Sequence, residues 1–166
     1  MGMLGFTLTF VGAVLLINGM GGLKRIDDRS MAVFNLMVGS LFLFAALLSL
    51  VRAETAQDFH GVVAILLFAF TYLYIAVSLW FDLDMRGVGW YCFFVALTTI
   101  HYAVLSYQGD DYRLGAMWLI WGGLWYLFYL SWVPGKNLGK LLSYATIATG
   151  ILTGWIPGLL MLTDNW

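Results

Sequence analysis

The sequence predicts an all-α integral membrane protein built as a bundle of six membrane-spanning helices. Three observations lead to this prediction. Of the 166 residues, 62% are hydrophobic and only 10% are charged, and the mean hydropathy is +0.88. Soluble domains carry about 25% charged residues. The few charged residues also gather in short clusters that are separated by long apolar stretches, so most of the surface suits lipid rather than water.

Each of the six apolar stretches is long enough to cross a membrane once. We expect helices over about 2–23, 30–51, 59–81, 87–108, 114–134 and 139–163, which leaves residues 1–166 as one transmembrane domain. A hydrocarbon core of about 30 Å needs about 20 residues of helix. The stretches are continuously apolar and do not alternate as outer-membrane barrel strands do. The first one lacks the charged start and cleavage site of a signal peptide, so we keep it as a helix.

The loop charges predict how the bundle is oriented. Positively charged residues are retained on the cytoplasmic side of a membrane protein. If the N-terminus lies outside, the cytoplasmic loops carry six of the eight Lys and Arg residues, namely Lys24, Arg25, Arg29, Arg86, Lys136 and Lys140. Only Arg52 and Arg113 fall on the other side. Both termini are therefore expected outside the cytoplasm.

Apart from Lys140 at the start of the last span, the spans contain no Asp, Glu, Lys or Arg, and this excludes several functions. Ion-coupled carriers and proton relays use ionisable groups at membrane depth, and enzymes need convergent acid, base or metal groups. We therefore expect a non-enzyme without cofactor or metal. The net charge of −1 provides no positively charged surface for binding nucleic acid. Cys92 is the single cysteine. His101 is the one ionisable exception, for which packing is a more common role than proton transfer.

Small residues recur at helix-packing intervals near both ends of the chain. Gly5, Gly12 and Gly19 follow a heptad, and Gly150, Gly154 and Gly158 follow four-residue steps. Such spacing lets helices approach closely in lipid, so the first and last helices should pack tightly. The last helix also carries Thr146, Thr149 and Thr153 on one face, where they either bond back to the helix backbone or line a pore. Pro157 is expected to kink this helix or to free a carbonyl.

Aromatic residues gather on two helices. Trp118, Trp121, Trp125 and Trp132 form one stripe on the fifth helix. The membrane interface explains Trp132 and Trp118, but Trp121 and Trp125 fall near mid-membrane, where a buried indole N–H needs a partner. Core packing is the more common explanation of such a stripe, and a path for a solute is the second. The aromatic run F-A-F-T-Y-L-Y in the third helix could complete a slot for a small planar neutral molecule.

Five strings, each in a different predicted helix, resemble the AmiS/UreI family of bacterial urea and short-chain amide channels. They are V-G-A-V-L-L-I-N-G (11–19), A-V-F-N-L-M-V-G (32–39), L-F-A-F-T-Y-L-Y (67–74), W-L-I-W-G-G-L-W (118–125) and G-I-L-T-G-W-I-P-G (150–158). The resemblance implies three helical hairpins around a pore in each protomer and a hexameric ring in the bacterial inner membrane, with periplasmic termini. It also implies passive flow of urea, acetamide or formamide toward a cytoplasmic urease or amidase.

The same resemblance assigns residues to the pore. Trp121 and Trp125 match the family's pore tryptophans, with Leu124 beside them and Trp118 one turn earlier. Further matching or neighbouring positions are Val11, Leu15, Asn18, Phe70, Tyr74, Thr149 and Thr153. Among these residues, Asn18 would supply an amide and Tyr74 a hydroxyl for hydrogen bonds to the solute.

Two departures from the acid-gated members predict weak acid gating or none. Those members have a glutamate before the G-I-L-T string, where this chain has Thr149. They also have a long first periplasmic loop rich in histidine and acidic residues, whereas the stretch from Arg52 to His60 is short and has one histidine. The alternatives to a channel are an ion-coupled secondary transporter of small amides and a purely structural membrane subunit.

Overall fold

The computed structural model describes residues 2–166 and contains six membrane-length helices. They are α1 (Gly2–Gly22), α2 (Asp28–Val51), α3 (Ala56–Trp80), α4 (Arg86–Gln108), α5 (Tyr112–Trp132) and a last helix over Gly139–Leu162. The last helix consists of α6 (Gly139–Thr149), the π-helical segment η1 (Gly150–Trp155) and α7 (Ile156–Leu162). No strand occurs within these residues. The all-helical class and the six spans predicted from the sequence are confirmed.

The helices begin slightly earlier than the charge clusters suggest, because charged residues lie inside their first turns. Asp27 caps α2 by accepting hydrogen bonds from the Ser30 N–H (2.9 Å) and hydroxyl (2.6 Å), and these bonds lower the pKa of its carboxyl. Thr55 and Asp58 form a reciprocal capping box at α3. Asp111 caps α5. Acidic caps satisfy N–H groups that a helix leaves unpaired.

The C-terminal ends of four helices are capped by a backbone turn. After α1, α3, α4 and α7, one residue adopts a left-handed conformation with φ between 52° and 59°, namely Lys24, Asp82, Asp110 and Asp164. The N–H of the following residue then bonds to a carbonyl five residues back, as Leu83 does to Ser78 at 2.8 Å. This Schellman arrangement satisfies terminal carbonyls, which allows each turn to be short.

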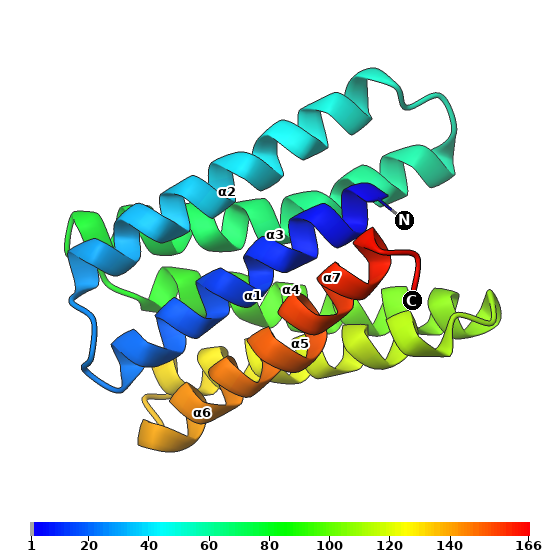
Figure 1. Ribbon diagram of the computed structural model, residues 1–166. Helices are drawn as coiled ribbons and strands as arrows, with labels where there is room; N and C mark the ends of the chain where they lie inside the picture. Colours follow the sequence, from blue (N-terminus) through cyan, green and yellow to red (C-terminus); the bar gives the residue numbers. More distant parts are fainter. Residues whose placement is uncertain (1) are drawn as a thin grey trace.

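The six helices form three antiparallel pairs (Figure 1). The α2/α3 and α4/α5 pairs are hairpins with short connections. The third pair joins α1 to the last helix, so it unites the two ends of the chain and is not a hairpin in sequence. The three antiparallel pairs agree with the three helical hairpins that the resemblance implied, although the helices of the third pair are far apart in sequence. Both termini lie at one end of the bundle (Figure 1).

Glycines bring α1 and the last helix into backbone contact, as the spacing predicted. A Cβ on Gly154 would lie 2.6 Å from the backbone nitrogen of Gly12, and a Cβ on Gly12 would lie 2.5 Å from the backbone nitrogen of Trp155. A Cβ on Gly158 would lie 2.6 Å from the nitrogen of Thr9. The closest approach therefore coincides with the π-helical segment.

The π-helical segment replaces the simple kink expected at Pro157. The Ile156 N–H bonds to the Ile151 carbonyl, five residues earlier. Proline has no N–H to continue the regular four-residue ladder, and a widened turn immediately before it accommodates that loss. Such widened turns occur often at functional sites.

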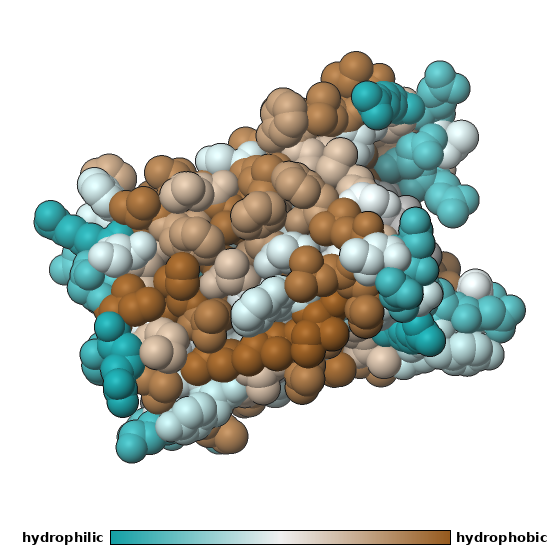
Figure 2. Space-filling model, viewed as in Figure 1, coloured by the Kyte–Doolittle hydropathy of each residue, from teal (hydrophilic) through white to brown (hydrophobic). Residues whose placement is uncertain are grey.

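The surface matches a membrane environment. Figure 2 shows a broad hydrophobic band with hydrophilic residues at the two ends. Large apolar side chains such as Phe44, Trp90 and Phe94 are more than half exposed in this band. The end opposite the termini carries the loops between α1 and α2, α3 and α4, and α5 and α6, and six of the eight Lys and Arg residues lie in or beside these loops.

Candidate functional site

Three cavities lie in a row along the bundle. The terminal cavity, at the end that holds both termini, has a volume of about 780 Å³, and the loop cavity at the other end about 390 Å³. The middle cavity between them measures only about 30 Å³. It shares Phe68 and Trp121 with the terminal cavity, and Asn18, Ile75 and Phe128 with the loop cavity. The row therefore narrows to a constriction at mid-bundle.

The middle cavity has no charged lining residue. Its walls come from α1, α3, α4 and α5 and consist of Leu15, Asn18, Phe68, Thr71, Tyr72, Ile75, Cys92, Trp121, Leu124, Trp125 and Phe128. One water occupies about 10–15 Å³ on this measure, so the cavity has room for a very small molecule. An ion that entered would lose its hydration without replacement.

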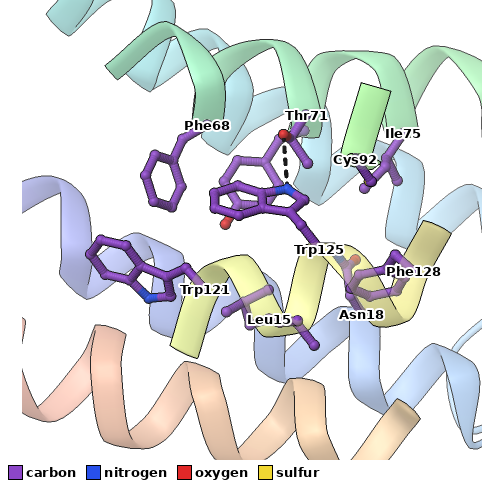
Figure 3. A pocket seen from close by; sticks show the side chains of 11 residues that line it. Leu15, Asn18, Phe68, Thr71, Ile75, Cys92, Trp121, Trp125 and Phe128 are labelled. Atoms are coloured by element: carbon purple, nitrogen blue, oxygen red, sulfur yellow. Dashed lines mark hydrogen bonds between the residues drawn. The ribbon is translucent and has the colours of Figure 1, made fainter. Parts of the chain in front are cut away.

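Two buried indoles form the wall on α5, and neither N–H group is free. The Trp121 Nε1–H donates to Thr153 Oγ1 at 2.8 Å, and the Thr153 hydroxyl donates to the Thr149 carbonyl at 2.6 Å. The Trp125 Nε1–H donates to Thr71 Oγ1 at 3.2 Å (Figure 3). The Thr71 hydroxyl in turn donates to the Leu67 carbonyl at 2.7 Å. These bonds fix both rings and leave only their carbon atoms to line the cavity.

Phe68 on α3 lies against both indoles (Figure 3). Its ring centroid is 5.2 Å from that of Trp121 and 5.0 Å from that of Trp125, and both contacts are edge-to-face. Trp118 contacts Trp121 in the same way at 5.0 Å. Edge-to-face pairs are a favourable aromatic geometry. Together these rings make the narrowest part of the row a rigid aromatic wall.

Two polar groups in the middle cavity remain available to a solute. Tyr72 is only 3% exposed and lines the cavity, and its hydroxyl makes no hydrogen bond to any of residues 2–166. Asn18 lines both the middle and the loop cavity. Both groups therefore offer a solute hydrogen-bonding partners inside an otherwise apolar cavity.

Asn18 is held by a second asparagine that sequence reasoning missed. The Asn18 amide donates to Asn35 Oδ1 at 3.1 Å, and the Asn35 amide donates to Asn18 Oδ1 at 2.6 Å. Asn35 is fully buried and also donates to the Met31 carbonyl at 2.9 Å. Each carboxamide oxygen accepts two hydrogen bonds and each nitrogen donates two. Asn18 therefore keeps one donor and one acceptor for a solute.

The structure brings most of the predicted site residues together. Leu15, Asn18, Trp121, Leu124 and Trp125 line the middle cavity, and Trp118 lines the terminal cavity. Thr149 and Thr153 are buried and act on the cavity through Trp121. Val11 is fully buried in the core and lines none of the three cavities.

The structure corrects the assignment of Phe70 and Tyr74. Both are on the outer surface of the bundle, 46% and 40% exposed, and neither lines a cavity of the row. Successive helical residues turn by about 100°, so residues two positions away face the opposite side. The cavity residues of α3 are Phe68 and Tyr72, which belong to the aromatic run expected to complete the slot, and also Thr71 and Ile75, which sequence reasoning did not assign to it.

Removing the hydroxyl that holds Trp121 should loosen the constriction. We predict that Thr153→Val lowers the unfolding temperature and reduces urea permeability several-fold. Valine keeps the shape but leaves the buried Trp121 N–H without its acceptor, at a cost of about 1–3 kcal/mol. Thermal unfolding in detergent and flux in proteoliposomes measure the two effects. Thr163→Val, which removes an exposed hydroxyl that bonds back to α7, is the matched control and should change neither quantity.

The Asn35→Leu variant should distinguish a role of Asn35 in orienting Asn18 from a role in folding. Interhelical hydrogen bonds in membranes contribute about 0.6 kcal/mol on average, so we expect the variant to fold. Urea permeability should fall several-fold, because Asn18 loses both reciprocal bonds that orient it. Flux per reconstituted protein is the measurement, with Asn165→Leu near the C-terminus as the control. If a folded Asn35→Leu protein keeps the wild-type permeability, permeation does not require Asn35 to orient the Asn18 side chain.

No group of three or more His, Cys, Asp or Glu side chains within residues 2–166 is arranged to hold a metal ion. A six-helix membrane bundle whose row of cavities narrows to an uncharged, aromatic-walled constriction has the features of a transport protein for neutral solutes. The chain belongs to the AmiS/UreI family: the family model, described as AmiS/UreI family transporter, matches residues 3–165.

Relatives and a solved structure agree with this assignment. The chain is 37% identical to the acid-activated urea channel of Helicobacter pylori, over 99% of this chain and 100% of that protein. It is 33% identical to a Mycolicibacterium smegmatis protein named as a candidate transporter of amidate substrates, over 98% of this chain and 78% of that protein. The crystal structure of the Helicobacter pylori urea channel superimposes with a TM-score of 0.91 at 37% identity, covering 98% of this chain and 99% of that chain. These homologues are channels or transporters and not enzymes.

Proposed function

We propose that the protein is a passive channel for urea and short aliphatic amides, with the row of three cavities as the path inside each protomer. The observation that carries the proposal is the middle cavity, which is narrow, uncharged and walled by the rings of Trp121 and Trp125. A planar neutral molecule can pass between aromatic rings, whereas an ion would lose its hydration there.

The polar groups along the path suit a small amide. The free hydroxyl of Tyr72 can donate to a carbonyl oxygen or accept from an N–H, and the free groups of Asn18 do the same at the loop end of the cavity. Urea and acetamide offer both kinds of atom. Two separated weak contacts replace hydration without trapping the solute, which is what rapid conduction requires.

The proposal includes the assembly and the location. A hexameric ring in the bacterial inner membrane, with both termini periplasmic, is supported by family membership and by the six Lys and Arg residues in or beside the loops at the end opposite the termini. In that setting, solute enters through the terminal cavity and leaves through the loop cavity toward a cytoplasmic urease or amidase.

Weak acid gating, or none, is also part of the proposal. The connection between α2 and α3 consists of residues 52–55, and its polar side chains are used in a helix cap: Asp58 accepts from the Thr55 N–H at 2.9 Å. Thr149, in place of the family's glutamate, presents its carbonyl to Thr153. Neither feature provides a group that titrates near neutral pH.

Stopped-flow light scattering on proteoliposomes tests the proposal. Urea and acetamide should equilibrate faster than in empty vesicles, at a rate that stays proportional to the gradient and ignores proton or sodium gradients. Rates at pH 5 and pH 7.5 should agree within about twofold. If flux saturates at low solute concentration and depends on an ion gradient, the protein is a coupled transporter instead. If permeability equals that of empty vesicles, the protein is a structural subunit.

A further inference from the structure

Two histidines that lie 41 residues apart in sequence meet at the terminal end of the bundle. His60 is in the first turns of α3, and His101 is in α4. Their Nε2 atoms share a hydrogen bond of 3.1 Å, and their ring centroids are separated by 5.1 Å at an interplanar angle of 76°. The path for neutral solutes uses neither imidazole for its constriction, so the pair calls for a separate explanation.

The pair is held in place by aromatic neighbours. His60 stacks on Tyr102 with centroids 4.3 Å apart, and the Tyr102 hydroxyl donates to the His60 carbonyl at 2.8 Å. Tyr102 in turn stacks on Trp118 at 4.6 Å. These contacts fix the backbone and the ring plane of His60, while His101 remains exposed. One imidazole is therefore oriented in advance, and the other is exposed on the surface of the bundle.

We propose that His60 and His101 form a binding site for a late first-row divalent metal ion such as Zn²⁺, Ni²⁺ or Cu²⁺. Zinc lies about 2.0–2.1 Å from a histidine nitrogen. Two nitrogens bound to one ion at angles of about 90–109° are then about 2.9–3.3 Å apart, and the observed 3.1 Å falls in this range. Imidazole suits these metals, whereas Mg²⁺ and Ca²⁺ prefer oxygen ligands.

The coordination of the proposed metal ion is incomplete, and the position of the site beside the terminal cavity affects transport. The two imidazoles supply two ligands, and water completes the coordination. His60 lines the terminal cavity together with Tyr102, Trp118 and Trp121. An ion bound to His60 lies at the wall of this cavity, where its coordinated water narrows the space left for a solute. It therefore slows neutral solutes on their way to the constriction.

Isothermal titration of purified protein with ZnCl₂ tests the site. The protein must carry no polyhistidine tag. We expect one Zn²⁺ per chain, and we expect His101→Asn and His60→Asn each to weaken binding at least tenfold. MgCl₂ and CaCl₂ should give no binding. His101 is the decisive position because its exposed side chain can change without disturbing the Tyr102 stack.

Three results would overturn the site: no Zn²⁺ binding to the wild-type protein, the same affinity in the folded His101→Asn variant, or equal binding of Mg²⁺. The consequence for transport is measured separately. Zn²⁺ should slow urea flux several-fold in wild-type proteoliposomes, reversibly with EDTA, and should have no effect on His101→Asn. This flux effect rests on the proposed function, whereas metal binding does not, so failure of either one is distinguishable from failure of the other.

Discussion

Replacing Ile75 by tryptophan should stop urea permeation almost completely. Ile75 is 7% exposed and lines the middle cavity where it meets the loop cavity. The middle cavity has a volume of about 30 Å³, which is far too small for the additional ring of an indole. Overpacking a core costs about 1–3 kcal/mol, which a bundle of six helices can tolerate. We expect at least a tenfold loss of urea flux, down to the level of empty vesicles.

Val77→Trp provides the control on the same helix. Val77 is 44% exposed on the outer surface, so the same bulky side chain lies in lipid and leaves the cavities open. Flux through this variant should equal that of the wild type at equal protein content. If Ile75→Trp folds, assembles and still conducts urea at the wild-type rate, the solute does not pass through the middle cavity.

The second large effect concerns folding. Gly154→Leu should prevent accumulation of a monodisperse protein. A Cβ at Gly154 would lie 2.6 Å from the nitrogen and 2.9 Å from the Cα of Gly12. Backbone atoms cannot move aside as a flexible side chain does, so α1 must separate from the last helix. That pair has no connecting loop and joins the two ends of the chain.

Fluorescence-detected size-exclusion chromatography measures this effect. Gly154→Leu should lose most of the symmetric peak of the wild-type protein, whereas Gly123→Leu should keep it. A Cβ at Gly123 on α5 would have no heavy atom of another residue within 4 Å outside its own stretch of helix, so the same change is accommodated. A wild-type elution profile and wild-type thermal stability for Gly154→Leu would show that close approach at η1 is not required for folding.

Hydropathy and charge placement predicted the helical class and the six spans, and glycine spacing predicted the tight packing of the first and last helices. These features depend on composition and on spacing within one segment. Helix starts were predicted two or three residues late at α2, α3 and α5, because residues such as Asp28, Asp58 and Arg113 were assigned to loops although they lie in first helical turns.

The site was only partly predictable, because its details arise between helices. The sequence placed Trp121 and Trp125 at mid-membrane and indicated that their N–H groups need partners. It did not indicate that Thr153 and Thr71 are those partners, since pairing across helices depends on how they rotate against one another. The same rotation placed Phe70 and Tyr74 outside the bundle and brought His60 to His101.

The consequence for mechanism is that the indoles serve as walls and not as hydrogen-bond donors. Both N–H groups are already bonded to threonine hydroxyls, so in the proposed channel a solute meets only the carbon atoms of the rings along the constriction. Selectivity of the proposed channel then rests on size and planarity, with hydrogen bonds from Tyr72 and Asn18. Bulky molecules are rejected because the constriction has no space for them, and charged molecules are rejected because nothing in it replaces their hydration.

Crystals soaked with selenourea test the path most directly, because selenium gives an anomalous signal and the molecule is a planar, neutral analogue of urea. The account predicts an anomalous peak within each protomer, at the middle cavity beside Phe68, Trp121 and Trp125. Peaks found only between protomers or at the lipid-facing surface, with the middle cavity empty at saturating selenourea, would contradict it.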